Sequence, residues 1–372
     1  MKSLPLEPAT TDPVNRKITV KISLLEILAC PRCGGWLAVK EASRNASDIT
    51  EGTLWCACGS TFQIEGAIPR FVSTDNYVRS FSFQWRKHQR TQLDVNDRRE
   101  SEETFLLSTG LTRDELAGKL VLDVGCGMGR FADVASRFGA EVVGVDLSYA
   151  IESAHKNIGA RPNVHLAQAD LFHLPFRKET FDCIFSIGVL HHTPDCRKAV
   201  LSLIPFLKEG GILAVWVYQK YKLHTLCQYS PERFTARPGE LPYVLQAPFR
   251  VSPRWMPIVA RTAIWVDRLN NVWNGTVRAV AQRLPVKVLY ALCHAAIPLY
   301  HVLKLRPFTP LRLIIKISMH PDPEWRVLDT FDNLSPRYQS RHTYEEVCGW
   351  FEEGGLRNIV LLPNQIAVRG QR

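Results

Sequence analysis

Short apolar runs alternate with amphipathic stretches over residues 119–219. Five of these runs predict strands: LVLDV at 120–124, EVVGVD at 141–146, NVHLAQAD at 163–170, FDCIFSIG at 181–188 and GILAVWVY at 211–218. Helices are expected between them at 130–138, 149–158 and 197–207. Strands that alternate with helices build parallel sheets with crossover helices, so the pattern predicts an α/β, doubly wound fold.

The alternation stops near residue 220 and resumes close to residue 343. TYEEVCGWFEEGGL predicts a helix that ends at Gly354 and Gly355, and NIVLLP and IAVRG predict two closing strands. The segment between is helix-like and broken by prolines, with 14 lysines and arginines against 3 acids in residues 221–320. Because sheet elements lie on both sides of it, we expect a basic helical cap inserted into a mostly parallel, seven-stranded, Rossmann-like sheet.

Changes in composition along the chain predict its domain organisation. We expect an arm at 1–22, a cysteine-containing unit at 23–73, a helical and aromatic-rich lead-in at 74–118, the core of the sheet at 119–220, the cap at 221–325 and the C-terminal part of the sheet at 326–372. With 372 residues, 46% of them hydrophobic, the chain is long enough for one sizeable core and a second module.

The N-terminal residues show neither the apolar run nor the cleavage site of a signal peptide, and no run of 18 apolar residues follows. These features favour a cytoplasmic protein. The longest uncharged run, residues 288–303, is interrupted by Pro298. It is too short to cross a bilayer comfortably, so peripheral contact with the inner membrane surface is favoured over a transmembrane helix.

A glycine-rich turn follows the first strand, in the order Asp123-Val-Gly125-Cys-Gly127-Met-Gly129. Asp146 ends the second strand, 21 residues after Gly125. Glycines let a ligand approach the backbone, and an acid at the next strand tip can accept both ribose hydroxyls. This arrangement predicts an adenosine-containing ligand, although dinucleotide dehydrogenases share the layout.

Two features favour S-adenosylmethionine (SAM) over a dinucleotide. A turn that binds pyrophosphate needs glycine three residues after its second glycine, and Arg130 stands there. SAM has no phosphate, so it does not need that glycine. Asp170, at the end of the third strand, is placed to accept the adenine amino group beside the backbone of Leu171.

Five motifs occur in a fixed order: VLDVGCGMGRFA, VGVDLS, QADLFHLPF, FDCIFSIGVLHHTPD and LKEGGILAVWVY. With them, residues 119–219 resemble the class I SAM-dependent methyltransferases of the broad type-11 group. The resemblance implies that Asp123 positions the SAM amino group, Asp146 holds the ribose and Asp170 holds the adenine. It implies further cofactor contacts from residues beside these three: Gly125, Cys126, Gly127, Gly129, Leu147, Leu171 and Ile187.

Three histidines are candidates for a catalytic base. His191 and His192 lie just after the fourth strand, and His342 lies where the chain is expected to fold back over the pocket. Histidine titrates near neutral pH, and a base helps when the acceptor must lose a proton. A structural role in the turn remains open for His191 and His192. The fourth strand lacks the Asn/Asp-Pro-Pro-Tyr/Phe motif of adenine and glutamine methylases, which disfavours those substrates.

The cysteine-containing unit carries two pairs, Cys30-Pro-Arg-Cys33 and Cys56-Ala-Cys58, separated by 22 residues. Four thiolates suit structural zinc, and a unit of about 50 residues is difficult to stabilise without such a staple. The segment resembles small zinc-ribbon proteins that act as partners of tRNA and protein methyltransferases. Because four cysteines leave no open coordination position, zinc here would be a scaffold. Reduced, packed cysteines remain the alternative.

The basic cap leaves three hypotheses open: a solvated lid, a lid that also contacts an anionic membrane or lipid-linked substrate, and a nucleic-acid surface. Its low acid content favours an anionic substrate. The expected function is methyl transfer to a small molecule, with lipid-linked compounds and secondary metabolites among the candidates. RNA (tRNA) methylation is the second hypothesis. A non-catalytic SAM-binding activator of a partner protein is the third. The sequence indicates no oligomeric state.

Overall fold

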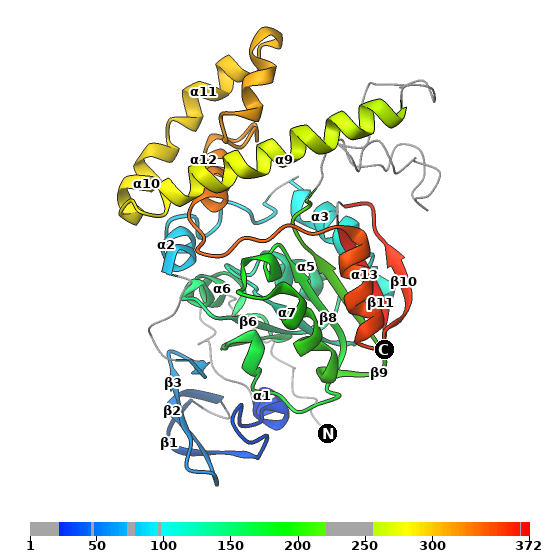
Figure 1. Cartoon of the computed structure of the whole chain (residues 1–372). Coiled ribbons are helices and arrows are strands. Elements are labelled where there is room, and N and C mark those ends of the chain that lie inside the picture. The colour runs from blue at the N-terminus through cyan, green and yellow to red at the C-terminus, as the bar shows by residue number, and fades with distance from the viewer. Residues whose placement is uncertain (1–21, 46–47, 73–78, 96–97, 221–255, 365) are drawn as a thin grey trace, which may run out of the picture.

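The computed structural model describes residues 22–45, 48–72, 79–95, 98–220, 256–364 and 366–372. The expected arm and the first part of the cap, residues 221–255, lie outside the described residues. Within the described chain, eleven strands form one continuous sheet in the order β1-β2-β3-β4-β7-β6-β5-β8-β9-β11-β10. The sheet stands at the centre of the molecule, with the cap helices above it in the view of Figure 1.

Seven of these strands form the expected Rossmann-like core. Five of them pair in parallel: β5 (Leu120–Val124), β6 (Glu141–Asp146), β7 (Val164–Gln168), β8 (Phe181–Ile187) and β9 (Leu207–Trp216). Two antiparallel strands close the far edge, β11 (Ala367–Gln371) beside β9 and then β10 (Arg357–Leu361). Every residue of β7 is buried, as expected for a strand covered on both faces. The prediction of a mostly parallel, seven-stranded, Rossmann-like sheet is confirmed.

Helices cover both faces of the sheet and produce two separate hydrophobic clusters. On one face lie α3 (Glu100–Thr109), α5 (Arg130–Arg137) and α6 (Ala150–Ile158), with Phe105 at the centre of the cluster. On the other face lie α7 (Cys196–Leu203) and α13 (Tyr344–Glu353), which pack through Leu203 and Phe351. The helix predicted to reach residue 207 instead ends at Leu203. The 3₁₀ turn η4 (Ile204–Phe206), which contains Pro205, leads directly into β9.

The cysteine-containing unit extends the central sheet instead of standing apart from it. It consists of α1 (Ile22–Ile27) and four strands: β1 (Leu37–Asn45), β2 (Asp48–Cys56), β3 (Thr61–Glu65) and β4 (Ile68–Arg70). β4 pairs in parallel with β7, and the Phe71 amide donates to the Gln168 carbonyl at 2.8 Å. The Arg70 side chain also donates to Oε1 of Gln168 at 2.9 Å. This joint was not predicted from the sequence.

The four paired cysteines converge at one end of this unit. Their Sγ atoms all lie within 4.8 Å of one another, with Cys30 and Cys58 at 3.8 Å and Cys33 and Cys56 at 3.5 Å. Tetrahedral zinc with Zn–S bonds of about 2.3 Å spaces its sulfur ligands by about 3.8 Å. A Cβ added at Gly35 would lie 3.3 Å from the Cys33 sulfur, so glycine leaves the sulfur cluster room. The cluster therefore has the dimensions of a four-thiolate metal site.

The lead-in and the cap supply the helices above the carboxyl ends of the strands. The lead-in contains α2 (Arg79–Lys87), α3 and α4 (Arg113–Leu116). The described cap contains α9 (Met256–Ala281), α10 (Val286–Cys293), α11 (Ala296–Leu303) and the 3₁₀ segment η6 (Arg306–Leu313). α12 (Pro323–Leu334) contacts α10, α11 and α2, so the expected domain boundary at residue 326 falls inside a helix that packs with the cap. Phe331 of α12 lies in a third hydrophobic cluster with Phe83 and Tyr290.

Candidate active site

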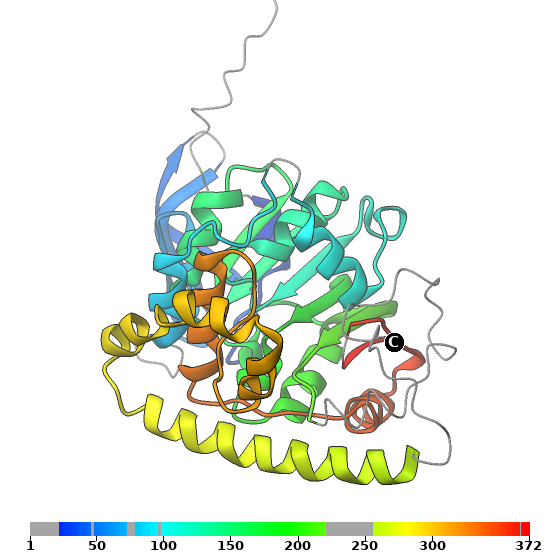
Figure 2. The same ribbon diagram turned by 90° about the horizontal axis from the view of Figure 1, so that it is seen from above.

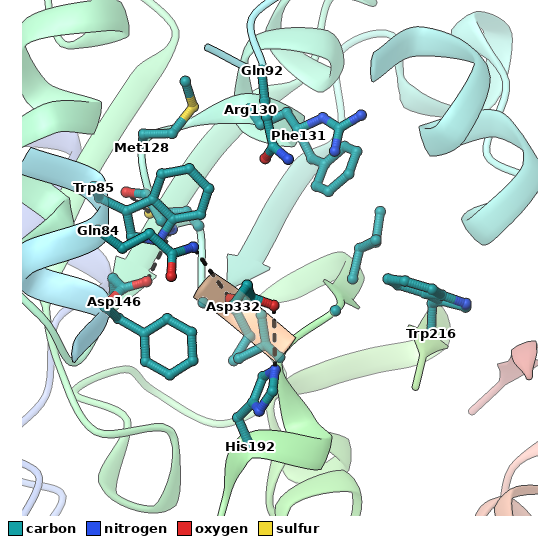
Figure 3. Close-up of a pocket in the computed structure, with 18 of the residues that line it drawn as sticks. Gln84, Trp85, Gln92, Met128, Arg130, Phe131, Asp146, His192, Trp216 and Asp332 are labelled. Carbon is teal, nitrogen blue, oxygen red and sulfur yellow. Dashed lines mark hydrogen bonds and ion pairs between the residues drawn. The ribbon is translucent and has the colours of Figure 1, made fainter. Parts of the chain in front are cut away.

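A cavity of about 570 Å³ lies at the carboxyl ends of the central strands. Its walls come from the loops that follow β5, β6, β7, β8 and β9, together with α2 from the lead-in and α12 beside the cap. Figure 3 shows Asp146, Trp85 and Gln84 close together, and Asp332 between Gln84 and His192, joined to both by dashed lines. Carboxyl ends of parallel strands are where open α/β sheets bind ligands.

The glycine-rich turn forms the floor of this cavity. Gly125, Gly127 and Gly129 have φ angles of 80°, 55° and 91°, the left-handed region that favours glycine. A Cβ at Gly125 would lie 2.4 Å from Val189. A Cβ at Gly127 would lie 3.4 Å from the Trp85 ring, so the ring packs close to the backbone of the turn. The turn can therefore present bare backbone to a ligand.

Asp146 is held at the tip of β6 by hydrogen bonds from two neighbours. Its Oδ2 accepts from the Gly127 amide at 2.9 Å, and its Oδ1 accepts from the Ser148 amide at 2.7 Å and the Ser148 hydroxyl at 2.6 Å. Burial raises the pKa of Asp146 above its ordinary value, while these hydrogen bonds act in the opposite direction. The carboxylate lines the cavity, and its neighbours hold it in place. Its remaining lone pairs can accept hydrogen bonds from the two hydroxyls of a ribose.

Asp170 begins the 3₁₀ turn η2 (Leu171–His173), and its carboxylate accepts from the Phe172 amide at 3.0 Å. It lines the cavity together with most of the expected cofactor residues: Gly125, Cys126, Gly127, Asp146, Leu147, Leu171 and Ile187. Gly129 does not line the cavity. A Cβ there would lie 2.7 Å from Ile158, so this glycine allows α5 and α6 to pack closely.

Asp123 lies behind the turn, outside the cavity wall. It is buried, and its Oδ2 has no hydrogen-bond partner among the residues that the structure describes. Burial raises its pKa well above the ordinary value, and the nearby charge of Asp146 raises it further. An unpartnered buried acceptor is costly unless a ligand or water completes it. A role in positioning the SAM amino group remains a prediction.

His192 is the candidate base that lines the cavity. Its Nδ1 lies 3.0 Å from the Tyr338 carbonyl oxygen, which can only accept, so the ring proton is on Nδ1 and Nε2 carries the lone pair. Nε2 lies 3.9 Å from Oδ2 of Asp332 (Figure 3). Burial lowers the pKa of His192 below its ordinary value, while Asp332 opposes that shift.

His191 and His342 do not line the cavity. The His191 ring stacks on Tyr218 with centroids 3.7 Å apart, and its Nδ1 accepts from the Tyr218 amide at 3.3 Å. The His342 ring is held between Glu346, at 3.1 Å, and the Ser340 hydroxyl, at 2.7 Å. The His191 ring therefore supports the backbone that follows β9, and the His342 backbone pairs with Tyr218 and Lys220 in the same segment.

Sequence reasoning missed much of the wall that faces the cofactor turn. α12 contributes Trp325, Leu328, Asp329, Asp332 and Asn333, and the end of β9 contributes Trp216 and Tyr218. Asp332 accepts from Gln84 Nε2 at 3.2 Å and from the Tyr218 hydroxyl at 3.1 Å. The aromatic composition of the lead-in was the one visible signal, because α2 supplies Phe81, Gln84 and Trp85 to the cavity.

Carboxylates outnumber arginines in the cavity lining, five to two: Glu100, Asp146, Asp170, Asp329 and Asp332 against Arg130 and Arg341. Asp329 lies one helical turn from Asp332, and burial together with that neighbouring charge raises the pKa of Asp329 to about 7. Arg130 and Arg341 supply the cationic groups of the lining. No lysine or arginine of the cap's described part, residues 256–325, lines the cavity. The basic charge of the cap is therefore directed elsewhere.

Comparison with known families agrees with both modules. A family model described as "Methyltransferase domain" matches residues 122–215, which contain the turn, Asp146 and Asp170. A second model, described as "Trm112p-like protein", matches residues 21–65, which contain all four clustered cysteines.

Curated relatives align with this chain over about 100 residues. "Probable tRNA methyltransferase 9B" of Mus musculus is 35% identical over 28% of this chain and 23% of its own length. "Methyltransferase GfsG" of Streptomyces halstedii is 36% identical over 27% of this chain and 38% of its own length. "Ubiquinone biosynthesis O-methyltransferase" of Coxiella burnetii is 34% identical over 26% and 43%. The chain thus spans less than half of each relative. From the two family matches and the geometry of the cleft, it contains a SAM-dependent methyltransferase domain preceded by a Trm112p-like domain.

Proposed function

We propose that this protein transfers the methyl group of SAM to a hydroxyl group of a small-molecule acceptor, with His192 as the base. One observation carries the proposal: the glycine turn, Asp146, His192 and Asp332 all line a single cavity. A methyl donor bound at the turn and Asp146 would therefore share this cavity with an acceptor beside the imidazole.

The residues on the cofactor side fit SAM. The turn offers bare backbone to the methionine end, Asp146 offers acceptors to the ribose hydroxyls, and Asp170 offers an acceptor to the adenine amino group. Asp123 and Asp146 also place negative charge close to the turn, and SAM brings a cationic sulfonium and an ammonium group. Opposite charges nearby stabilise the ionised carboxylates that burial otherwise disfavours.

The acceptor side fits proton removal from an alcohol. SAM supplies an electrophilic methyl group on sulfur. The acceptor oxygen bonds to the methyl carbon as the carbon–sulfur bond breaks, sulfur keeps the electron pair, and the hydroxyl proton passes to Nε2 of His192. Asp332, 3.9 Å away, stabilises the resulting imidazolium. Tyr338 holds the opposite nitrogen and keeps Nε2 directed inward.

The wall composition favours a small molecule over RNA. Glu100, Asp329 and Asp332 line the cavity in addition to Asp146 and Asp170, and carboxylates repel a phosphate backbone. Arg130 and Arg341 are the groups that would hold a single anionic substituent of an acceptor. RNA methylation stays the second candidate because the ribbon matches the Trm112p-like model and one relative is named as a probable tRNA methyltransferase.

We further propose that Cys30, Cys33, Cys56 and Cys58 hold one structural zinc ion. The support is the sulfur cluster within 4.8 Å and its agreement with tetrahedral thiolate spacing. Four protein ligands complete the coordination sphere, so the metal would stabilise the ribbon and the β4–β7 joint and would take no part in methyl transfer.

Purified protein should contain one equivalent of zinc by elemental analysis, and Cys56→Ser should contain none. Zinc at about 1,000 times its Kd stabilises a fold by about 4 kcal/mol, so its removal should lower the melting temperature of a chain of this length by roughly 5 °C. Cys348→Ser, outside the cluster on α13, is the matched control and should keep its zinc. A zinc-free wild type with an unchanged melting curve would contradict the metal site.

Calorimetry with S-adenosylhomocysteine tests the cofactor site. Asp146→Ala removes the ribose acceptors and should weaken binding at least about 100-fold, because hydrogen bonds to a charged group contribute about 1.5–3 kcal/mol each. Asp114→Ala, on the exposed surface of α4, should bind like wild type. Equal affinity of all three proteins would end the assignment of the cleft.

Labelled SAM incubated with fractionated cell extract tests the acceptor class. We expect the label to enter small metabolites or extractable lipids. Label in RNA would select the second candidate. If no fraction becomes labelled while S-adenosylhomocysteine binds and Asp146→Ala does not, the chain would be a SAM-binding activator and not an enzyme.

The pH profile of the reaction with the acceptor found in this way tests His192. Because its pKa is lowered, the neutral base should persist below pH 6.5, and kcat should fall only as pH drops through that lower pKa. His192→Gln should lower kcat about 10²–10⁴-fold. Asp332→Asn should lower kcat and move the acid limb to still lower pH, since it removes the charge that raises the His192 pKa. His342→Gln should leave the profile in place, and loss of the acid limb in that variant would refute the role of His192.

A further inference from the structure

The longest helix of the cap, α9, is amphipathic, but its apolar side faces solvent. A helix packed on a protein normally turns its apolar side inward. At 100° per residue, Trp265, Leu269, Val272 and Val280 lie on one side of α9. Their exposed fractions are 64%, 65%, 70% and 58%. The apolar side of the helix therefore faces away from the protein.

The opposite side of α9 is polar and attaches the helix to the protein. The Asn271 amide donates to the Lys220 carbonyl at 3.0 Å, and the side chains of Arg278 and Gln282 both donate to the Pro336 carbonyl at 2.6 Å. These hydrogen bonds fix which side of the helix faces inward. They leave the apolar stripe outward as a consequence of the fold.

The neighbouring cap segments extend this apolar exposure. Exposed side chains there include Val288, Leu292, Val302, Leu305, Phe308, Leu311 and Ile314. The Trp273 indole donates to the Ile314 carbonyl at 2.8 Å, and Arg312 donates to the Leu303 carbonyl at 3.0 Å, so α9, η6 and α11 are tied together. Figures 1 and 2 show α9, α10 and α11 at the periphery, away from the central sheet. By length and composition alone, the stretch Val286–Leu303 would also pass as a membrane span, but a turn at His294 divides it into α10 and α11.

The charge of the cap complements an anionic surface. Residues 268–321 contain eight lysines and arginines and no aspartate or glutamate. Four of the basic side chains are exposed in the structure: Arg268, Arg283, Lys287 and Lys304. None of them lines the cavity, so none of them is placed to contact a ligand there. Exposed apolar side chains with interspersed lysine and arginine are the composition of interfacial membrane-binding helices.

We propose that the outer face of the cap, defined by Trp265, Leu269, Val272 and Val280 with Arg283, Lys287 and Lys304, docks on an anionic lipid bilayer. The apolar members are mostly aliphatic. Aliphatic side chains insert among acyl chains but do not stack on bases, which selects lipid over single-stranded RNA. Docking on this face does not depend on which molecule is methylated in the cavity.

Flotation of the full-length protein with phosphatidylcholine vesicles, with and without about 30% phosphatidylglycerol, tests the surface. The protein should float with the anionic vesicles and remain at the bottom with neutral ones. Leu269→Gln combined with Val272→Gln should reduce binding at least tenfold without changing the net charge. Val95→Gln combined with Val360→Gln, two exposed valines outside the cap, is the matched control and should float like wild type.

The basic residues have a separate test. Arg283→Gln, Lys287→Gln and Lys304→Gln together should reduce binding to anionic vesicles at least tenfold, and higher salt should weaken wild-type binding in the same way. S-adenosylhomocysteine affinity should be unchanged in every variant, which shows that each one is folded and separates this test from that of the active site.

Three outcomes would overturn the proposal. In the first, wild type does not float with anionic vesicles. In the second, wild type floats and the cap variants float equally well. In the third, the wild type does not bind vesicles but forms a dimer or binds RNA. The combined Leu269→Gln and Val272→Gln substitutions then abolish the dimer or the RNA binding. The face would then belong to a second copy of the chain or to nucleic acid.

Discussion

The hydrogen bond from the Gly127 amide to the Asp146 carboxylate is the interaction on which the site depends, because it joins the turn after β5 to the tip of β6. Asp123 lies behind the same turn, and burial together with Asp146 raises its pKa. Two carboxylates are thus held close together in poorly solvated surroundings, at a cost that a cationic ligand relieves. The charge of the sulfonium cofactor matches this local arrangement.

The cap separates two kinds of surface that its composition alone does not distinguish. Its basic and aliphatic residues face outward, while α12 directs Asp329 and Asp332 into the cavity. Net positive charge in a segment therefore did not predict a positive pocket. The inner wall instead provides acceptors around His192, and one of them, Asp332, also accepts from Gln84 and Tyr218 and is fixed by them.

The ribbon contributes to the site indirectly, through the sheet. β4 pairs with β7 at Gln168, two residues before Asp170. Folding of the ribbon therefore supports the strand whose end carries the expected adenine acceptor. The Ala29 amide adds a second attachment, to the Pro175 carbonyl at 2.9 Å. A module that looked like an appended domain in the sequence is the edge of the catalytic sheet.

The sequence by itself determined the mostly parallel, seven-stranded sheet, the glycine turn, the positions of Asp146 and Asp170 and the grouping of four cysteines. All of these follow from short-range patterns or from the rule that parallel strands end at one edge. Only the tertiary structure decided that His192, and not His191 or His342, faces the cavity, that α12 forms its opposite wall, and that α9 turns its apolar side outward. Those outcomes depend on contacts between distant segments, such as that of Gln84 with Asp332 across 248 residues, which local patterns do not encode.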